Sequence, residues 1–595
     1  MRYIAVAALA LVGTAMMSCS ENDFAENSPK GKPVTLTTTI SLDGSGTRAL
    51  DADGKKTFAK GEQIALIYES EKDGVQKAVA TLQETDILND GKSATLTFSL
   101  EKAPKKEGEF AMIYPASMAI ESIPDGGEFG DCASPNYALL YNQNGKLDSL
   151  STKLDLATCE ETFTENATLP GSISLANKLA ILELTDITDY AGNDLTSEIT
   201  KLQITVMGSS TYQVNRTAAA GPIYIALPPC SDNAIAFSTT INGTDYSKTA
   251  PSKTLAASTM TPVKLKMQKL VNLYYLTSDY TAQDGDRLYH MLIEKVKISI
   301  AAGATVELED ANINVNDDGS ARRNDGAYAG ITCLGDATII LEGTNKVNAF
   351  ADDYPGIQAA HNASGEEFTL TIQGDGSLEV TGGKYAAGIG GGIQFDCGNI
   401  VIAGGTITAK GGDTGAGIGS GNYGKCGDIT IEGGNITAKG NAGAGIGSGQ
   451  YGTCGDITIS GGEIKEATGV HYAAGIGSGY GAECGDITIS GGKIELAKGG
   501  GEAAGIGSGY YGECGSITIG TGITKVTATR GNNSIYCIGQ GNNSTCTSVT
   551  FGSDQVYNGD SWSVSLAAGD HQYGGLNLNV KSDDSGEIWT LTPSN

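Results

Sequence analysis

Six cysteines divide the C-terminal half of this 595-residue chain into blocks of similar sequence, at intervals of 28 to 32 residues. The three clearest blocks each read Cys-Gly-Asp-Ile-Thr-Ile and continue with a Gly-Gly turn, a second short strand pattern and an Ala-Gly-Ile-Gly element. A repeat of about 20 to 50 residues is typical of a solenoid, a propeller or another repeat array. The six residues, here called the column cysteines, are Cys397, Cys426, Cys454, Cys484, Cys514 and Cys546.

The alternation within each block selects among these repeat architectures. In Ile457-Thr458-Ile459 the isoleucines fall on one face and the threonine on the other, as in a half-buried strand. The blocks have neither the Trp-Asp signature of a propeller nor the leucines of a leucine-rich repeat. Three short strands per block therefore predict one coil per repeat, with each strand stacked in parallel on its counterpart. The pattern resembles the right-handed parallel β-helix of bacterial surface adhesin-like proteins.

We expect this β-helix to occupy residues 269–595. Its first coils are irregular up to about residue 386, with an N-terminal cap over 273–302, and regular repeats follow over 387–548. A C-terminal cap containing Trp562 and Trp589 would then close the exposed end.

Residues 33–268 carry short alternating runs that are broken by Gly, Asp, Asn and Pro, the pattern of β-sandwiches. Several short motifs resemble the fimbrillin family of Bacteroidetes. This resemblance implies two sandwich domains, over 33–165 and 166–268. The complete fold prediction is all-β: tandem fimbrillin-like sandwiches followed by a right-handed parallel β-helix. The motifs are Thr47-Arg48-Ala49, Gly61-Glu62-Gln63-Ile64, Tyr114-Pro115, Leu179-Ala180-Ile181-Leu182 and Leu227-Pro228-Pro229.

The same resemblance suggests a role for Arg48. In fimbrillins that polymerise, cleavage after such an arginine removes a first strand, and a strand from a neighbouring subunit replaces it. The alternative is an exposed arginine in a linker. A β-helix stands where a stalk subunit would carry its donor strand, which suits an anchor, tip or accessory component of a fimbria and makes fimbrial subunits candidate partners.

The N-terminus predicts export and a lipid anchor. Residues 1–18 combine one positive side chain with an apolar run and end in a small residue before Cys19, as in a secretory signal. Met16-Met17-Ser18-Cys19 resembles a lipobox, which implies acylation of Cys19. The acidic residues of the tether, 19–32, resemble the signal that sends Bacteroidetes lipoproteins to the outer face of the outer membrane. We expect a surface-exposed outer-membrane lipoprotein of a Gram-negative bacterium.

Composition excludes one class of partner and disfavours one class of activity. The formal net charge is −29, which opposes binding to nucleic acid. Only four His are present, so the chain offers little material for metal or acid–base sites. We expect no cofactor and no nucleic-acid partner.

Three columns in the β-helix are candidate functional features. The column cysteines could form a disulfide ladder, but stacked side chains point the same way, so the sequence favours buried free thiols. Asp428, Asp456 and Asp486 would stack at a solvated corner, each accepting a local backbone N–H; a calcium row is the weaker alternative. No metal site is otherwise predicted.

The third candidate is an aromatic strip two to four residues before the column cysteines. Its rings at coil spacing could stack on the sugars of a glycan. The alternative is a self-stacked ladder that seals the corner. The strip comprises Phe395, Tyr423, Tyr451, Tyr480 and Tyr511.

These features favour a non-catalytic adhesion or carbohydrate-binding protein that contacts a glycan or a host surface. A β-helix polysaccharide lyase or glycoside hydrolase is the first alternative, and a purely structural fibre subunit is the second. An enzyme needs a non-repeating cluster of acids and bases. The irregular segment 317–361, with Arg322, Arg323, Asp352 and Asp353, is where such a cluster would lie.

Overall fold

The computed structural model is all-β and forms two compact units. The first comprises residues 1–139 and 150–179, and the second comprises residues 140–149 and 180–595. No helix in the described part of the chain combines the length and the apolar character needed to span a membrane. The described residues are 33–42, 57–314, 328–361, 368–563, 569–572, 578–583 and 585–593.

The first unit is built on an eight-stranded sheet in the order β3-β2-β6-β8-β9-β1-β5-β4. β1 lies inside the sheet, antiparallel to β5 and parallel to β9. Because β9 belongs to this sheet, the unit runs to Leu179, beyond the boundary at residue 165 that we expected. The strands are β1 (Val34–Leu42), β2 (Gln63–Glu69), β3 (Val75–Thr81), β4 (Ile87–Leu88), β5 (Ser93–Leu100), β6 (Glu109–Tyr114), β8 (Ala157–Thr162) and β9 (Ser172–Asn177).

The second unit begins with a second set of mainly antiparallel strands. β14 and β15 form a long hairpin, β10 pairs with both β13 and β16, and β7 (Asn142–Gln143) joins β12 in parallel. The strands are β10 (Ala180–Asp189), β11 (Lys201–Val206), β12 (Thr211–Asn215), β13 (Ile223–Leu227), β14 (Cys230–Ile241), β15 (Thr244–Leu255) and β16 (Met260–Asn272).

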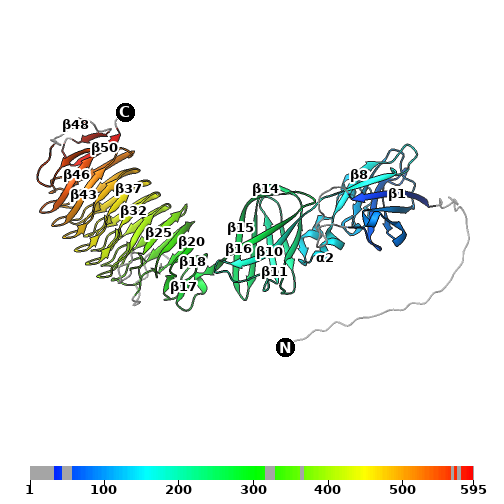
Figure 1. Cartoon of the computed structure of the whole chain (residues 1–595), viewed down its shortest axis with the longest axis horizontal. Helices are drawn as coiled ribbons and strands as arrows, with labels where there is room; N and C mark the ends of the chain where they lie inside the picture. The colour runs from blue at the N-terminus through cyan, green and yellow to red at the C-terminus, as the bar shows by residue number, and fades with distance from the viewer. Residues whose placement is uncertain are drawn as a thin grey trace, which may run out of the picture. The chain divides into compact units, whose positions relative to one another are not determined.

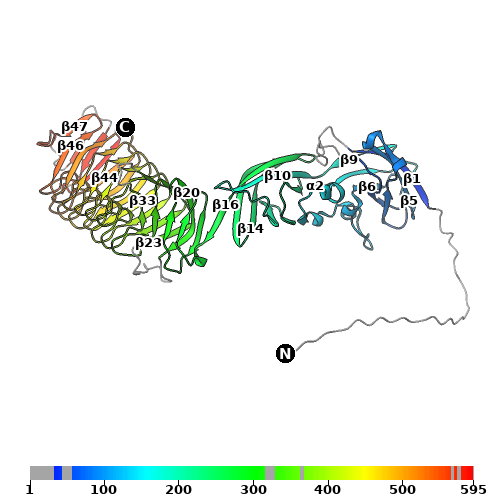
Figure 2. The same cartoon turned by 60° about the horizontal axis from the view of Figure 1, so that its bottom comes forward.

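The first coil of the β-helix lies in the segment where we expected an N-terminal cap. β16 pairs in parallel with β18 (Arg287–Met291), and β18 pairs in parallel with β20 (Ala304–Ile313). The expected cap over 273–302 is therefore already a coil, because its strands stack in register on those of the next turn. Figure 1 shows the coils following one another from β17 (Tyr280–Ala282) in green to β46 (Thr545–Phe551) in orange, and Figure 2 shows the same stack from a second side.

Three stacks of parallel strands form the faces of the β-helix. The first contains β20 (Ala304–Ile313), β22 (Ala337–Glu342), β25 (Thr369–Gly374), β28 (Asn399–Ile402), β32 (Ile429–Ile431), β36 (Ile457–Ile459), β40 (Ile487–Ile489), β43 (Glu513–Ile519) and β46 (Thr545–Phe551). The second contains β23 (Thr344–Asn348), β26 (Ser377–Thr381), β29 (Thr406–Lys410), β33 (Asn435–Gly440), β37 (Glu463–Gly469), β41 (Lys493–Lys498) and β44 (Lys525–Thr529).

The third stack is made of very short strands. Its later members are the two-residue Ile-Gly elements of the repeats. It contains β17 (Tyr280–Ala282), β19 (Ile298–Ile300), β21 (Ile331–Cys333), β24 (Ile357–Gln358), β27 (Ile389–Gly390), β30 (Ile418–Gly419), β34 (Ile446–Gly447), β38 (Ile476–Gly477), β42 (Ile506–Gly507) and β45 (Ile538–Gly539).

The repeat pattern places the same residue type at the same level of every coil. Ile457 pairs with Ile429 below and Ile487 above, and all three are fully buried. Thr458, between two inward isoleucines, is only half-buried. Alternation in the sequence thus becomes a continuous column of isoleucine inside the β-helix, as predicted.

Antiparallel strands end the β-helix. β50 (Ile588–Pro593) pairs with β44, and Trp589 is 3 % exposed. The indole rings of Trp562 and Trp589 lie 5.7 Å apart at nearly right angles. The other strands here are β47 (Asp554–Tyr557), β48 (Gly569–Gln572) and β49 (Leu578–Ser582).

Candidate functional site

The turn before each column cysteine carries the candidate aromatic residues. It leads into the short strands β31 (Lys425–Cys426), β35 (Thr453–Cys454) and β39 (Glu483–Cys484), which pair in parallel and in register. Tyr423, Tyr451 and Tyr511 each lie three residues before their cysteine, whereas Tyr480 lies four residues before and Phe395 two. The residues of the predicted strip therefore occupy three different positions of the turn.

The position three residues before the cysteine has an unusual backbone. Tyr423, Tyr451 and Tyr511 have φ angles of 54°, 53° and 53°. This left-handed region costs a non-glycine residue about 1 to 2 kcal/mol. The equivalent position carries Gln394, Gly481 and Asn543 in the other coils, with φ angles of 57°, 61° and 52°. The turn therefore imposes this conformation in every coil, and three tyrosines occupy it although glycine or asparagine would adopt it with less strain.

The tyrosine rings form a continuous cluster. The rings of Tyr423 and Tyr451 are stacked at 5.0 Å, and Tyr451 continues to Tyr480 at 5.3 Å. The ring of Tyr451 lies over Gly481, where a Cβ would be 2.8 Å from a ring carbon, so glycine in that coil makes room for the ring. Tyr480 also contacts Tyr472, Tyr510 and Tyr511, and Tyr510 contacts Tyr472 and Tyr511.

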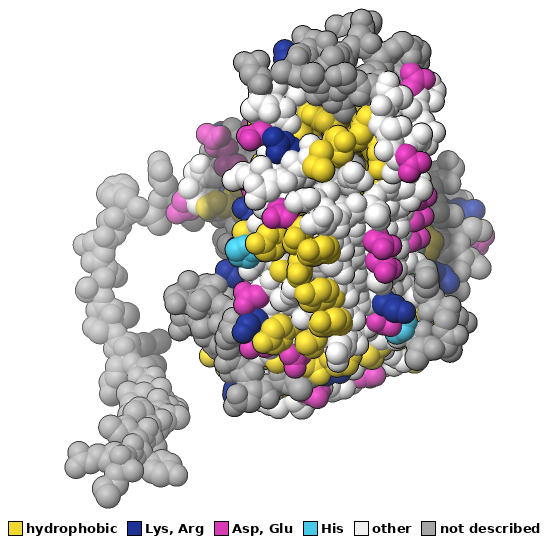
Figure 3. Space-filling view, turned by 90° about the vertical axis from the view of Figure 1, so that its left-hand side faces the viewer, with side chains coloured by type: hydrophobic (Ala, Val, Ile, Leu, Met, Phe, Trp, Pro, Cys, Tyr) yellow, Lys and Arg dark blue, Asp and Glu magenta, His cyan; other side chains and the backbone are white. Residues whose placement is uncertain are grey.

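The cluster is self-stacked and still open to solvent. Tyr423 is 56 % exposed, Tyr511 55 %, Tyr472 44 % and Tyr451 40 %. Because Tyr423 and Tyr451 cover one face of each other, the pair offers ring edges and hydroxyl groups rather than two free faces. Figure 3 shows hydrophobic side chains, with tyrosine counted among them, in a band along one face of the β-helix.

Sequence reasoning missed Tyr472 and Tyr510, and it joined Phe395 to the wrong neighbours. Phe395 stacks at 5.5 Å on Tyr354 of the preceding coil. Among the described residues no ring contact joins it to Tyr423. Tyr510 directly precedes Tyr511 and could have been found by the same spacing. Tyr472 lies in the loop after β37 and has no signal in the repeat. We call Tyr423, Tyr451, Tyr472, Tyr480, Tyr510 and Tyr511 the tyrosine cluster.

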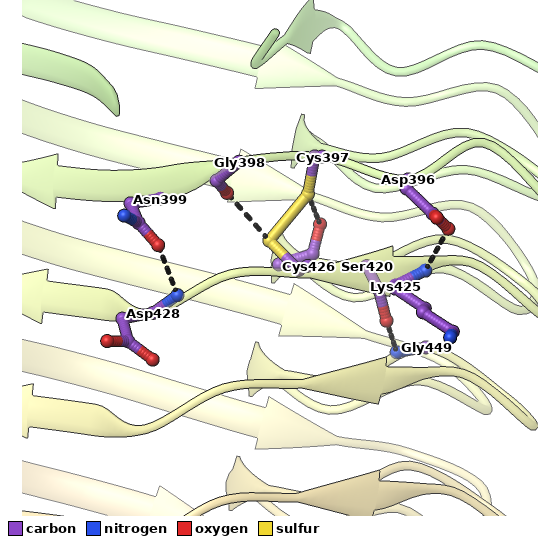
Figure 4. Close-up of a disulfide and its surroundings, with 10 residues drawn as sticks. Asp396, Cys397, Gly398, Asn399, Ser420, Lys425, Cys426, Asp428 and Gly449 are labelled. Carbon is purple, nitrogen blue, oxygen red and sulfur yellow. Dashed lines mark hydrogen bonds between the residues drawn. A yellow bond between two sulfur atoms is a disulfide. The ribbon is translucent and has the colours of Figure 1, made fainter. Parts of the chain in front are cut away.

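The column cysteines differ from the expectation of free thiols. Cys397 and Cys426 form a disulfide with a Cα–Cα distance of 4.6 Å, whereas the other four are buried thiols. The prediction was wrong for this pair because vertical stacking places the two Cα atoms within the range that a disulfide spans. Figure 4 shows the bond crossing directly from one coil to the next.

The aspartate column bonds across coils and not within its own turn. The Asp428 Oδ1 atom accepts the backbone N–H of Asp456 at 2.8 Å, and the Asp456 Oδ1 atom accepts that of Asp486 at the same distance. Asn399 begins the series by accepting from Asp428 N–H, as Figure 4 shows. Our expectation of a hydrogen bond within the same turn was therefore wrong, because each carboxylate bonds to the backbone of the next coil.

We expect Asp456→Asn to retain stability and Asp456→Ala to lose about 1 kcal/mol, which is typical of one hydrogen bond. The asparagine keeps the acceptor oxygen, as Asn399 does, and removes one of three stacked charges. Chemical denaturation of both variants measures the difference. Equal losses for the two variants would contradict the proposed role of the oxygen.

The candidate metal and catalytic residues form no comparable cluster among the described residues. No group of three His, Cys, Asp or Glu side chains in the described ranges is placed to hold a metal ion. In the irregular segment, Nε2 of His361 lies 3.7 Å from a carboxylate oxygen of Asp396. Arg322 and Arg323 lie outside the described residues, as do Cys19 and Arg48.

A family model for a β-helix repeat matches five stretches of the chain, namely residues 370–393, 400–422, 429–450, 457–480 and 487–510. The C-terminal region is thus a parallel β-helix by both its strand pairing and its repeat sequence. A search of curated proteins found no match to the chain.

Three solved structures similar to this chain come from species of Bacteroides and Parabacteroides. A putative cell adhesion protein from Bacteroides ovatus is 13 % identical, over 40 % of this chain and 95 % of that one, with a TM-score of 0.22. One from Bacteroides uniformis is 15 % identical, over 40 % and 96 %, with a TM-score of 0.23. A fimbrial assembly protein from Parabacteroides distasonis is 11 % identical, over 40 % and 94 %, with a TM-score of 0.24. At these TM-scores the likeness assigns no function to the chain.

Proposed function

We propose that this chain is a non-catalytic adhesion protein of the bacterial surface that binds glycans through the tyrosine cluster. The observation that carries the proposal is the left-handed backbone of Tyr423, Tyr451 and Tyr511. Strain of this kind is held by the surrounding structure and clusters at ligand-binding sites. The three rings are at least 40 % exposed, so burial does not offset the strain.

The cluster has the chemistry of a carbohydrate-binding surface. Tyrosine combines a rigid apolar ring with a hydroxyl group, which suits a wet interface with sugar rings and their hydroxyls. The successive rings follow the coils at 5.0 and 5.3 Å, so an extended glycan can contact several of them. The net charge of −29 favours a neutral glycan over an acidic one, because like charges repel.

The proposal includes a lipid anchor at Cys19 in the outer membrane, which rests on the lipobox resemblance of residues 16–19. A fimbrial role rests on the fimbrillin motifs. β1 ends at Leu42, six residues before Arg48, so cleavage after Arg48 would release the strand that lies between β5 and β9. A neighbouring subunit could then fill the groove.

Binding of the full chain to a glycan array tests the proposal, with wild type compared with Tyr423→Asn/Tyr451→Asn. We expect the double variant to bind about 5- to 150-fold more weakly, because two ring contacts, each worth about 0.5 to 1.5 kcal/mol, are lost. Asparagine suits the left-handed backbone, as Asn543 shows, so thermal stability should be equal or higher.

The matched control is Tyr274→Asn/Tyr275→Asn, since these tyrosines are 51 % and 74 % exposed and lie outside the cluster. This control should bind as wild type does. Undiminished binding by the cluster variant would refute the site. If the wild-type chain binds no glycan, the alternative of a structural fibre subunit is favoured. If it releases reducing ends or unsaturated products from a polysaccharide, the enzyme alternative is favoured.

A further inference from the structure

The six column cysteines occupy one vertical row through successive coils. Cys397 and Cys426 are bridge partners, and strand register continues the row through each later cysteine. All six are between 3 % and 8 % exposed. The row therefore consists of equivalent buried positions, one per coil, and only its first pair is cross-linked in the structure.

Each of the four remaining thiols lies opposite a column cysteine of the next coil, as Cys397 lies opposite Cys426. Strand register makes Cys484 the direct partner of both Cys454 and Cys514, and Cys514 the direct partner of Cys546. Stacked strands are about 4.8 Å apart, close to the 4.6 Å between the Cα atoms of the disulfide. Each neighbouring pair thus has the separation that a disulfide needs.

We propose that the exported chain carries three stacked disulfides along this row. Once the first pair is closed, four cysteines remain, and only one pairing of neighbours leaves no thiol unpaired. A bond between Cys484 and Cys514 would leave Cys454 and Cys546 without a partner, because two coils lie between them. The proposed bonds are Cys397–Cys426, Cys454–Cys484 and Cys514–Cys546.

The oxidation requires an electron acceptor, which is the disulfide form of a thiol–disulfide oxidoreductase in the exporting compartment. One cysteine thiolate attacks that disulfide and forms a mixed disulfide, and the second cysteine then displaces the reduced enzyme. Each bond transfers two electrons and two protons from the cysteine pair to the oxidoreductase, which leaves with its own disulfide reduced to two thiols. Contact with the Cys484 thiol and burial raise the pKa of Cys454, so thiolate is scarce in the finished β-helix and the bonds form while coils are still closing.

Such bonds would fasten the coils in pairs. Each disulfide crosses one interface between coils, and the next interface has no disulfide and is held by hydrogen bonds and core packing. A coil therefore cannot peel away singly from its bonded neighbour, which suits a rod that bears load during attachment. The inference relies on the proposed export, because a reducing compartment would leave every cysteine as a thiol.

Peptide mapping of the full chain recovered from the cell surface tests the pairing. The protein is alkylated in denaturant without reductant and digested with trypsin, since Lys or Arg lies between every two neighbouring column cysteines. We expect three cross-linked peptide pairs and alkylation of the cysteines outside the row. Cys537 shares a peptide with Cys546, and fragment ions distinguish them. The alkylated set is Cys132, Cys159, Cys230, Cys333 and Cys537.

The variant Cys484→Ser provides an internal control. We expect Cys454 alone to become alkylated, while the bonds on either side of it remain. Alkylation of the last four column cysteines in wild type, beside an intact Cys397–Cys426 bond, would overturn the proposal and establish the buried-thiol alternative. A bond between Cys484 and Cys514 would also overturn it. Loss of all three bonds in a chain retained inside the cell would refute the export and not the pairing.

Discussion

Replacing Gly447 with alanine is expected to destabilise the β-helix by about 4 kcal/mol or more. Gly447 has a φ of +134°, a conformation that side-chain-bearing residues rarely adopt. A Cβ here would lie 1.9 Å from the carbonyl oxygen of Gly477 in the next coil. That oxygen accepts a hydrogen bond from Ser448 N–H at 3.1 Å, so the methyl group must push apart the backbones that this bond joins.

The matched control is Gly520→Ala, also in the β-helix. Its Cβ would meet nothing closer than the Cα atom of Ser490 at 3.5 Å, which is ordinary contact. We expect a change within about 0.5 kcal/mol. Chemical denaturation followed by circular dichroism, together with limited proteolysis of the coils, measures both variants. If Gly447→Ala unfolds at the same denaturant concentration as the wild type, the coils do not stack as closely as described.

Ile457→Ala should cost about 3 kcal/mol, within the 2 to 5 kcal/mol that such core truncations typically lose. Ile457 is fully buried, and its register partners Ile429 and Ile487 occupy the same column. The coils above and below are fixed by backbone bonds at strand spacing, so they cannot collapse into the cavity. The loss therefore combines the transfer term with most of the cavity term.

Thr458→Ala is the control for this truncation, because the adjacent side chain lies on the outer face and is half-buried. We expect a loss below about 1 kcal/mol from Thr458→Ala in the same denaturation experiment. Similar losses for the two variants would contradict the assignment of inward and outward faces. The contrast tests the alternation from which the fold was first predicted.

Local periodicity made most of the β-helix predictable. The isoleucines of each Ile-Thr-Ile unit required one buried face, and the cysteine spacing required one unit per coil. The coil formed by residues 273–302 was not predictable, and we expected a cap there, because β17 and β18 have no repeat sequence and are recognised only by their parallel partners. Likewise β9 belongs to the first sheet through its pairing with β1 and β8, which a boundary drawn at residue 165 could not anticipate.

The candidate site was predictable only in outline. Spacing from the cysteines identified Tyr423 and Tyr451 but could not reveal their left-handed backbone, which depends on how the turn closes against the coil below. Tyr472 joins the cluster from a loop outside the repeat and contacts Tyr510 at 5.5 Å. Phe395 stacks on Tyr354 because it lies one residue nearer its cysteine than Tyr423 and Tyr451 do.

The sequence by itself determined the stacking of coils, because alternation and a fixed period leave parallel register as the way to bury every isoleucine at once. Tertiary structure decided what the stacked residues do with one another. Asp456 bonds to the coil above, Cys397 joins Cys426, and Tyr423 covers Tyr451. These outcomes depend on separations of about 5 Å between residues some 30 positions apart in the chain, and such distances exist only once the coils have closed.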